Sequence, residues 1–160
     1  MRQLHDMTEW HEIAQLLDSC HSLVLCEIGE PEENVLRMLL VETFVSAEPE
    51  SLQVGGTTIE DLHRVQPTSS SRRFELTWNQ YIAYGVTNES FGSATGTEAP
   101  DSARLLRVYI ESPFLDFVAR STLATKQYPG PYTHVQVLSE NHIVDVVSTV
   151  LPVLRIVAPS

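Results

Sequence analysis

The chain has 160 residues, of which 42% are hydrophobic and 19% are charged, and its formal net charge at pH 7 is −11. These values are typical of a folded globular protein and exclude a disordered chain or a fibrous repeat. The sequence contains no apolar run near the roughly 20 residues that span a bilayer, and its N-terminus lacks the features of a secretory signal. We therefore expect a cytoplasmic protein, folded as a single domain over residues 1–160.

The negative charge is concentrated in the first part of the chain. Residues 1–62 contain thirteen acidic and two basic residues, whereas residues 63–160 contain eight of each. Such a surface repels phosphate backbones and anionic lipids, so we expect neither nucleic acid nor a membrane as a partner. A basic protein would be attracted. Acidity that only maintains solubility is the alternative interpretation.

We expect the two cysteines, Cys20 and Cys26, to be buried and reduced, and a disulfide between them is the alternative. Together with His21 they lack the paired C-x-x-C spacing of structural zinc sites, so we expect no bound metal. The sequence contains neither a GxGxxG nor a GxxxxGK[ST] motif, and hence predicts no cofactor. It also lacks the GxSxG and HExxH motifs of common hydrolases.

The N-terminal part predicts one helix followed by two strands. Asp6 and Glu9 resemble a capping box, and an apolar stripe at helical spacing follows them. The stripe consists of Met7, Trp10, Ile13, Leu17 and Cys20. Residues 23–28 and 35–45 are dense in apolar and branched side chains, which indicates adjacent antiparallel strands joined by a turn at 29–34. Gly55-Gly56 marks a turn or a bulge, and residues 57–65 after it predict another strand.

The clearest alternation in the chain lies between residues 74 and 86. Bulky residues occupy every second position, which predicts one long strand through the centre of the core. They are Phe74, Leu76, Trp78, Gln80, Ile82, Tyr84 and Val86. Gln80 is the polar member, and a buried amide needs partners. It either bonds a bend of the backbone or lines a polar cavity, for which Trp78, Gln80 and Tyr84 are weak ligand-binding candidates.

The next segments are a long loop, a strand and a second helix. Residues 88–103 are rich in Gly, Ser, Thr and acidic residues without apolar periodicity, so we expect a mobile loop. Residues 106–111 alternate as a half-buried strand. Ser112-Pro113 then starts a helix, with serine as N-cap and proline in the first helical position. That helix should turn Phe114, Phe117, Val118 and Ser121 inward and end near Leu123.

The last unit predicts a hairpin of residues 133–138 and 142–149. If the loop contains only Glu140 and Asn141, facing residues have numbers that sum to 281. Gln136 then lies opposite Asp145, with His134 nearby on the same face. A carboxylate beside an imidazole is an arrangement that general-base catalysis uses, so these three are weak catalytic candidates. Since the sequence identifies no nucleophile, the alternative is that these residues form a solvated sheet face or a hydrogen-bonded cover for the C-terminus.

These elements predict an α+β protein. We expect a bent antiparallel sheet of about six strands, or a partly open barrel, with the N-terminal helix and the second short helix packed against it. We expect a non-enzymatic protein-interaction module, for example an inhibitor or immunity-type protein that covers a basic partner. The alternatives are a small-ligand-binding protein or enzyme that uses a cavity inside the bent sheet, and a homodimer joined through an apolar sheet edge.

Overall fold

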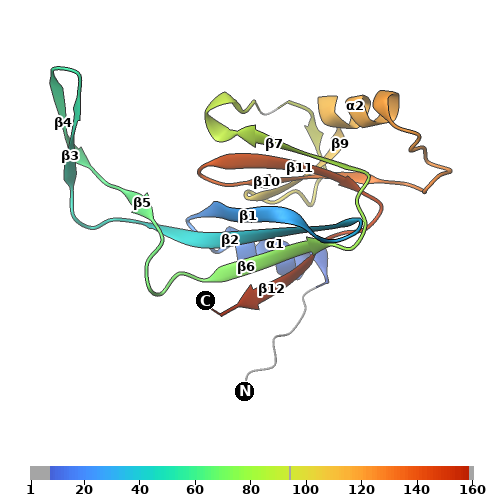
Figure 1. Ribbon diagram of the computed structural model, residues 1–160, viewed down its shortest axis with the longest axis horizontal. Coiled ribbons are helices and arrows are strands. Elements are labelled where there is room, and N and C mark those ends of the chain that lie inside the picture. Colours follow the sequence, from blue (N-terminus) through green and yellow to red (C-terminus); the bar gives the residue numbers. More distant parts are fainter. Residues whose placement is uncertain (1–7, 94, 159–160) are drawn as a thin grey trace.

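The computed structural model describes residues 8–93 and 95–158, and it shows an α+β fold built mainly of antiparallel strands (Figure 1). One sheet has the strand order β1-β2-β6-β12, with β5 paired to β2. The bounds are β1 Ser22–Glu32, β2 Val35–Val45, β5 Val65–Gln66, β6 Arg73–Trp78 and β12 Val153–Val157. The fold class predicted from the sequence is confirmed.

The second sheet has the order β7-β11-β10-β9-β8. The bounds are β7 Ala83–Asn88, β8 Thr97–Glu98, β9 Leu106–Glu111, β10 Thr133–Leu138 and β11 His142–Ser148. A short 3₁₀ helix, η1 Glu89–Phe91, follows β7. The two sheets do not close into a barrel, and they hold more strands between them than the six expected. The extra strands include the short β5 and β8, two residues each, which carry too little periodicity to be read from sequence.

Both sheets and the first helix share one hydrophobic core. The helix α1 Trp10–Asp18 buries Ile13 and Leu17, while Phe74 and Trp78 come from the first sheet and Val146 from the second. The second helix, α2 Pro113–Ser121, lies on the other side of the second sheet, away from the first sheet (Figure 1). The second sheet therefore has one face in the core and one face toward α2.

The predicted continuous strand over residues 74–86 is wrong, because β6 and β7 belong to different sheets. The chain leaves the first sheet after Trp78 and enters the second at Ala83. The alternation in the sequence spans the break because β6 turns Phe74, Leu76 and Trp78 toward the shared core and β7 turns Tyr84 toward it. Val86, the last residue of the predicted set, is exposed. Gln80 lies in the connection and is exposed, so it needs no buried partner.

The helix predicted at the N-terminus is present, with Glu9 at its N-cap and without a side-chain cap bond. Asp6 and Met7 lie outside the described residues. At the other end, Asp18 accepts hydrogen bonds from the N–H groups of Arg104 and Leu105, both at 3.0 Å. The guanidinium of Arg104 in turn donates to the carbonyls of Cys20 and His21. These bonds satisfy carbonyls beyond the end of α1 and hold it beside β9.

An ion pair joins Glu42 of β2 to Arg72, the residue before β6. The guanidinium of Arg72 donates to both carboxylate oxygens of the buried Glu42, at 2.8 and 2.6 Å. Hydrogen bonding from Arg72 lowers the pKa of Glu42. Arg72 also donates to the sulfur of Cys20, whose pKa is raised to about 11, chiefly by burial. Both cysteines are free, with Cys20 buried and Cys26 exposed.

The hairpin predicted from residues 23–28 and 35–45 is confirmed, with the second strand as predicted and the first strand longer. The first strand runs to Glu32, and the turn is reduced to Glu33 and Asn34, where Asn34 adopts the left-handed conformation with φ 62°. Asparagine tolerates this conformation better than most residues. The edge of β1 meets the other sheet at Asn141, whose side chain accepts from the N–H and donates to the carbonyl of Leu25.

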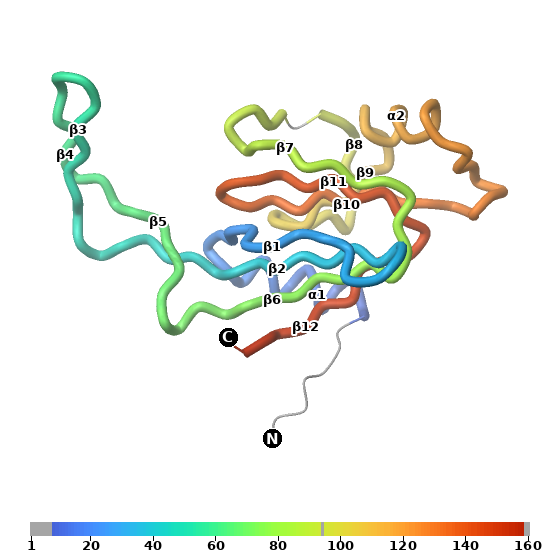
Figure 2. The backbone as a smooth tube through the Cα atoms, viewed as in Figure 1, coloured from blue at the N-terminus to red at the C-terminus, as the bar shows by residue number. Residues whose placement is uncertain are grey.

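A two-stranded ribbon leaves the body of the molecule (Figures 1 and 2). It consists of β3 Glu50–Val54 and β4 Thr57–Leu62, which pair with each other and with no other strand of the described residues. Gly55 and Gly56 form the turn predicted between them. We call residues 46–64 the arm. At its base, the N–H of Ser46 donates to the carbonyl of Arg64 at 2.7 Å.

Candidate functional site

The register of the β10–β11 hairpin places the three predicted site residues together. Its partners have numbers that sum to 281, as expected, so Gln136 lies opposite Asp145. Val135 and Val146 point into the core, and because side chains alternate along a strand, His134, Gln136 and Asp145 share the opposite face. This face is the one that α2 covers.

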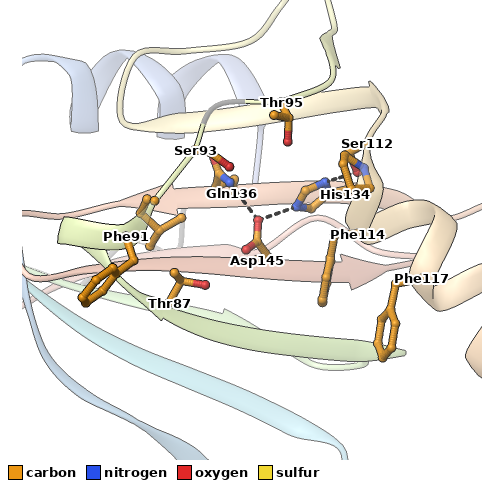
Figure 3. Close-up of a pocket in the computed structure, with 13 residues that line it drawn as sticks. Thr87, Phe91, Ser93, Thr95, Ser112, Phe114, Phe117, His134, Gln136 and Asp145 are labelled. Carbon is orange, nitrogen blue, oxygen red and sulfur yellow. Dashed lines mark hydrogen bonds and ion pairs between the residues drawn. The ribbon is translucent and has the colours of Figure 1, made fainter.

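His134 joins a serine to a carboxylate. Its Nε2 lies 2.8 Å from Oδ1 of Asp145, and its Nδ1 lies 2.8 Å from the hydroxyl of Ser112 (Figure 3). The imidazole is 2% exposed, while the Asp145 side chain is 16% exposed. The ring of Tyr109 stacks on the imidazole with centroids 4.9 Å apart. His134 is therefore held on both ring nitrogens and on one ring face.

Gln136 extends this network. Its amide nitrogen donates to Oδ1 of Asp145 at 2.8 Å, and its amide oxygen accepts from the hydroxyl of Tyr109 at 3.1 Å. One carboxylate oxygen of Asp145 thus receives the bonds from both Gln136 and His134. The other oxygen, Oδ2, accepts no hydrogen bond from the described residues.

A cavity of about 300 Å³ opens above this network. Its floor comes from β7, β10 and β11, and its walls come from the first turn of α2 and from the segment after β7 (Figure 3). The lining residues are Thr87, Phe91, Gly92, Ser93, Thr95, Ser112, Pro113, Phe114, Phe117, His134, Gln136, Ile143 and Asp145. Most of the wall is aromatic or hydroxylated.

Sequence reasoning recognised Ser112 as a helix N-cap but missed its contact with His134. The N-cap is confirmed, because the Ser112 hydroxyl oxygen accepts from the N–H of Leu115 at 3.0 Å. The contact depends on the pairing of β9 with β10, where His134 lies opposite Tyr109. No local pattern predicts that pairing. Of the predicted inward stripe of α2, only Val118 is buried, and Phe117 is 53% exposed at the cavity.

Ser112, His134 and Asp145 have the connectivity of a nucleophile, a base and an orienting carboxylate. Three features oppose acyl transfer. The Ser112 oxygen already accepts the Leu115 N–H, and the following residue, Pro113, has no N–H to donate to an oxyanion. The ring nitrogens are also interchanged relative to the usual triad, in which Nε2 faces the serine. The arrangement instead fixes one carboxylate at the floor of a cavity.

The other three candidates, Trp78, Gln80 and Tyr84, do not share a cavity. Trp78 is fully buried, and its indole N–H has no hydrogen-bond partner among the described residues. Gln80 lines a separate pocket with Tyr81 and Pro129. Tyr84 packs against the core and meets Tyr81 edge to face.

Comparisons with protein-family models, with curated proteins and with solved structures found no match to this chain. Within residues 8–93 and 95–158, three or more His, Cys, Asp or Glu side chains nowhere gather as metal ligands would. Neither α1 nor α2 has the length and apolar composition that crossing a bilayer requires.

The arm is the second candidate surface. In β3–β4, Leu52 lies opposite Ile59 and Val54 opposite Thr57, so these side chains share one face of the ribbon. Leu52, Val54 and Ile59 are all exposed. Gln53 and Thr58, which also pair, share the other face. The ribbon therefore has one apolar face and one polar face, and no other strand pairs with its edges in the described part of the chain.

Proposed function

We propose that this protein is a protein-interaction module whose arm docks into an apolar groove of a basic partner protein. The observation that carries the proposal is the apolar face of the arm, formed by Leu52, Val54 and Ile59 at a distance from the core of the molecule (Figure 2). A form of this function is an inhibitor or immunity-type protein that covers a basic enzyme.

The physical argument starts from stability. A two-stranded hairpin with no further packing is marginally stable in water. Proteins normally hide or charge an exposed strand edge, because open edges and apolar faces cause aggregation. An arm that instead exposes Leu52 opposite Ile59 gains its stabilisation when a partner covers that face. The apolar contact supplies affinity, at about 25 cal/mol for each Å² removed from water.

The charge of the arm selects the partner. The arm contains four acidic residues, Glu48, Glu50, Glu60 and Asp61, and one basic residue, Arg64. Arg64 pairs with Glu50 at 2.7 Å. The excess acid lies on a chain whose first 62 residues carry all of its net charge. A basic surface around an apolar groove complements both properties, and the same field repels a second acidic copy of this chain.

The test compares variants of the two faces of the arm. In L52S/I59S the apolar face becomes polar, whereas the matched control Q53S/T58S alters the opposite face of the same ribbon. Each chain is used to capture proteins from the cells that produce it, and each captured protein is then purified and titrated against all three chains. We expect a basic protein that binds the wild type and the control alike, and that binds L52S/I59S about tenfold or more weakly.

Salt and self-association complete the test. Binding should weaken when NaCl is raised from about 50 mM to about 500 mM, because the Debye length contracts severalfold over this range. The proposal is wrong if no purified protein distinguishes L52S/I59S from Q53S/T58S, or if the one that does is acidic. It is equally wrong if sedimentation at several concentrations shows that the arm joins two copies of this chain.

A further inference from the structure

The cavity below α2 contains a carboxylate with one oxygen that accepts no hydrogen bond from the described residues. Among the described residues that line it, Asp145 has the one carboxylate and no arginine or lysine is present. Oδ1 of Asp145 receives both hydrogen bonds, from His134 and Gln136. Oδ2 receives none from the described residues. One anionic oxygen is thus held in place and available to a ligand.

The hydrogen bonds around His134 can all be formed by a ring that carries a single proton. The Ser112 oxygen accepts from the Leu115 N–H, so its own hydroxyl proton can point toward Nδ1 of His134. The ring proton then lies on Nε2 and is donated to Asp145. This tautomer is assigned from the hydrogen-bond network. A neutral imidazole orients the carboxylate without cancelling its charge.

The walls of the cavity favour a cation that carries apolar groups. Figure 3 shows Asp145 between Phe91 on one side and Phe114 on the other, with Phe117 beyond Phe114. Phe91 is 82% exposed, which leaves a large apolar surface in water. Aromatic faces attract cations by about 0.5–2 kcal/mol. The same aromatic rings can pack against the aliphatic part of a ligand that carries the cation.

Two features oppose a cation. The first is Arg107, which lies opposite Gln136 on β9 and pairs with Glu98 at 3.7 Å. The second is a helix end. The N-terminal end of α2 borders the cavity at Ser112 and Pro113, and a helix N-terminus carries about half a positive charge. Two of its first N–H groups, those of Leu115 and Asp116, are already bound to Ser112. The carboxylate of Asp145 carries a full charge with one oxygen free. The charge of the carboxylate therefore makes the electrostatic potential in the cavity negative.

We propose that this cavity binds an ammonium or guanidinium group on a short apolar stem, with Oδ2 of Asp145 as its anionic partner. A cavity of about 300 Å³ is at the small end of ligand sites, which suits such a group. The cation belongs either to a free small amine or guanidine, or to a lysine or arginine side chain of a partner. In the second case the inference rests on the proposed interaction function.

Binding can be tested by following the backbone amide NMR signals of the intact chain during titration. The probes are n-butylammonium and n-butylguanidinium, with n-butyrate as the anion of similar length. We expect the two cations to shift the signals of Gly85, Thr87 and Ser112, and butyrate to leave them unchanged. N-acetyl-lysine amide and N-acetyl-arginine amide are titrated in parallel. Tighter binding of these assigns the site to a partner side chain, and tighter binding of the alkyl cations assigns it to small amines.

Variants locate the site. Asp145→Asn should weaken cation binding about tenfold or more, since it removes the charge that pairs with the ligand. The control Asp116→Asn removes an exposed carboxylate from the first turn of α2, which borders the cavity, and should change binding less than twofold. If Asp145→Asn does not fold, Thr87→Lys places an ammonium group of the protein at the cavity from an exposed position, and it should abolish binding.

The inference is overturned if the cations leave these signals unshifted, if butyrate binds as well as butylammonium, or if Asp145→Asn and Thr87→Lys both bind like the wild type. A failure of this inference can be distinguished from a failure of the proposed interaction function. The arm variant L52S/I59S should bind butylammonium as the wild type does, because the arm contributes no residue to the cavity.

Discussion

Gly85 lies directly opposite Asp145 in the β7–β11 pair, and the ring of Phe114 packs over the place where a side chain at Gly85 would be. A Cβ atom at this position would lie 3.4 Å from the Phe114 ring. The missing side chain therefore lets α2 approach the sheet beside the carboxylate, and it fixes the position of one aromatic wall of the cavity.

This contact predicts a graded response to side-chain size at Gly85. Alanine should fit with a loss of less than about 1 kcal/mol, whereas valine should displace Phe114 and cost about 1–3 kcal/mol. The free energy of unfolding in urea measures both. As a control, a Cβ atom added at Gly29 meets no atom within 4 Å, so Gly29→Ala introduces no crowding. The losses of unfolding free energy in Gly29→Ala and Gly85→Ala should therefore be similar. Equal stability of Gly85→Val and the wild type would contradict the packing of α2 described above.

The ion pair between the buried Glu42 and Arg72, whose side chain is 33% exposed, predicts a stability effect. Glu42→Gln leaves the guanidinium without its bidentate partner, so we expect a loss of about 1.5–3 kcal/mol at pH 7. Urea unfolding measures the change, and Glu140→Gln, at an exposed carboxylate, should differ from the wild type by less than about 0.5 kcal/mol. A double-mutant cycle with Arg72→Met should give a coupling well above zero.

The same pair predicts a pH dependence in acid. Hydrogen bonding from Arg72 lowers the pKa of Glu42 in the folded protein, so the folded state holds fewer protons than the unfolded state in this range. The contribution is complete above the ordinary pKa of 4.5 and is lost as the pH falls below it toward the folded value. The stability gap between the wild type and Glu42→Gln should therefore narrow in acid. A gap that stays constant would place the carboxylate outside the ion pair.

The two cysteines should differ in reactivity. Cys26 is exposed, whereas burial raises the pKa of Cys20 to about 11 and shields its sulfur. An aromatic disulfide reagent at pH 8 should modify one thiol per folded chain quickly and the second only upon unfolding. Cys26→Ser should abolish the fast reaction, and Cys20→Ser should leave it unchanged. Equal rates for both thiols would mean that Cys20 is not buried in the folded protein.

The arm should be removable without loss of the body. Ser46 and Arg64 are hydrogen-bonded neighbours, so residues 47–63 can be replaced by a two-residue Asn-Gly turn. Because the deleted strands pair only with each other within the described structure, the midpoint of thermal unfolding should change by no more than about 4 °C. A fall of tens of degrees would show that the arm belongs to the folding unit, and would remove the basis for treating it as a docking element.

The hairpin that carries the site could be predicted from the sequence, because period and loop length are local properties. They fix that Gln136 faces Asp145 and that His134 shares their side of the sheet. Ser112 could be recognised only as a helix cap, since its contact with the imidazole depends on strands β9 and β10 lying side by side. Pairing between distant strands is decided by the whole core and leaves no mark in either strand.

The sequence could not reveal the break between β6 and β7 or the isolation of the arm. Residues 79–82 continue the alternation of bulky side chains in the sequence, so the pattern looks like one strand, although Gln80 is exposed and the odd-numbered Tyr81 packs against the core. The turn at Gly55-Gly56 could be predicted, but β3 and β4 have the composition of ordinary strands. What distinguishes them is that the body of the protein offers them no neighbour, and this is a property of the rest of the fold.

The side chain of Asn141 occupies both main-chain groups of Leu25 on the outer edge of β1. A foreign strand that approached this edge would find the donor and the acceptor at that position already taken. Growth of the sheet from molecule to molecule is thereby obstructed at β1, which protects a chain rich in apolar strands from polymerising through this side.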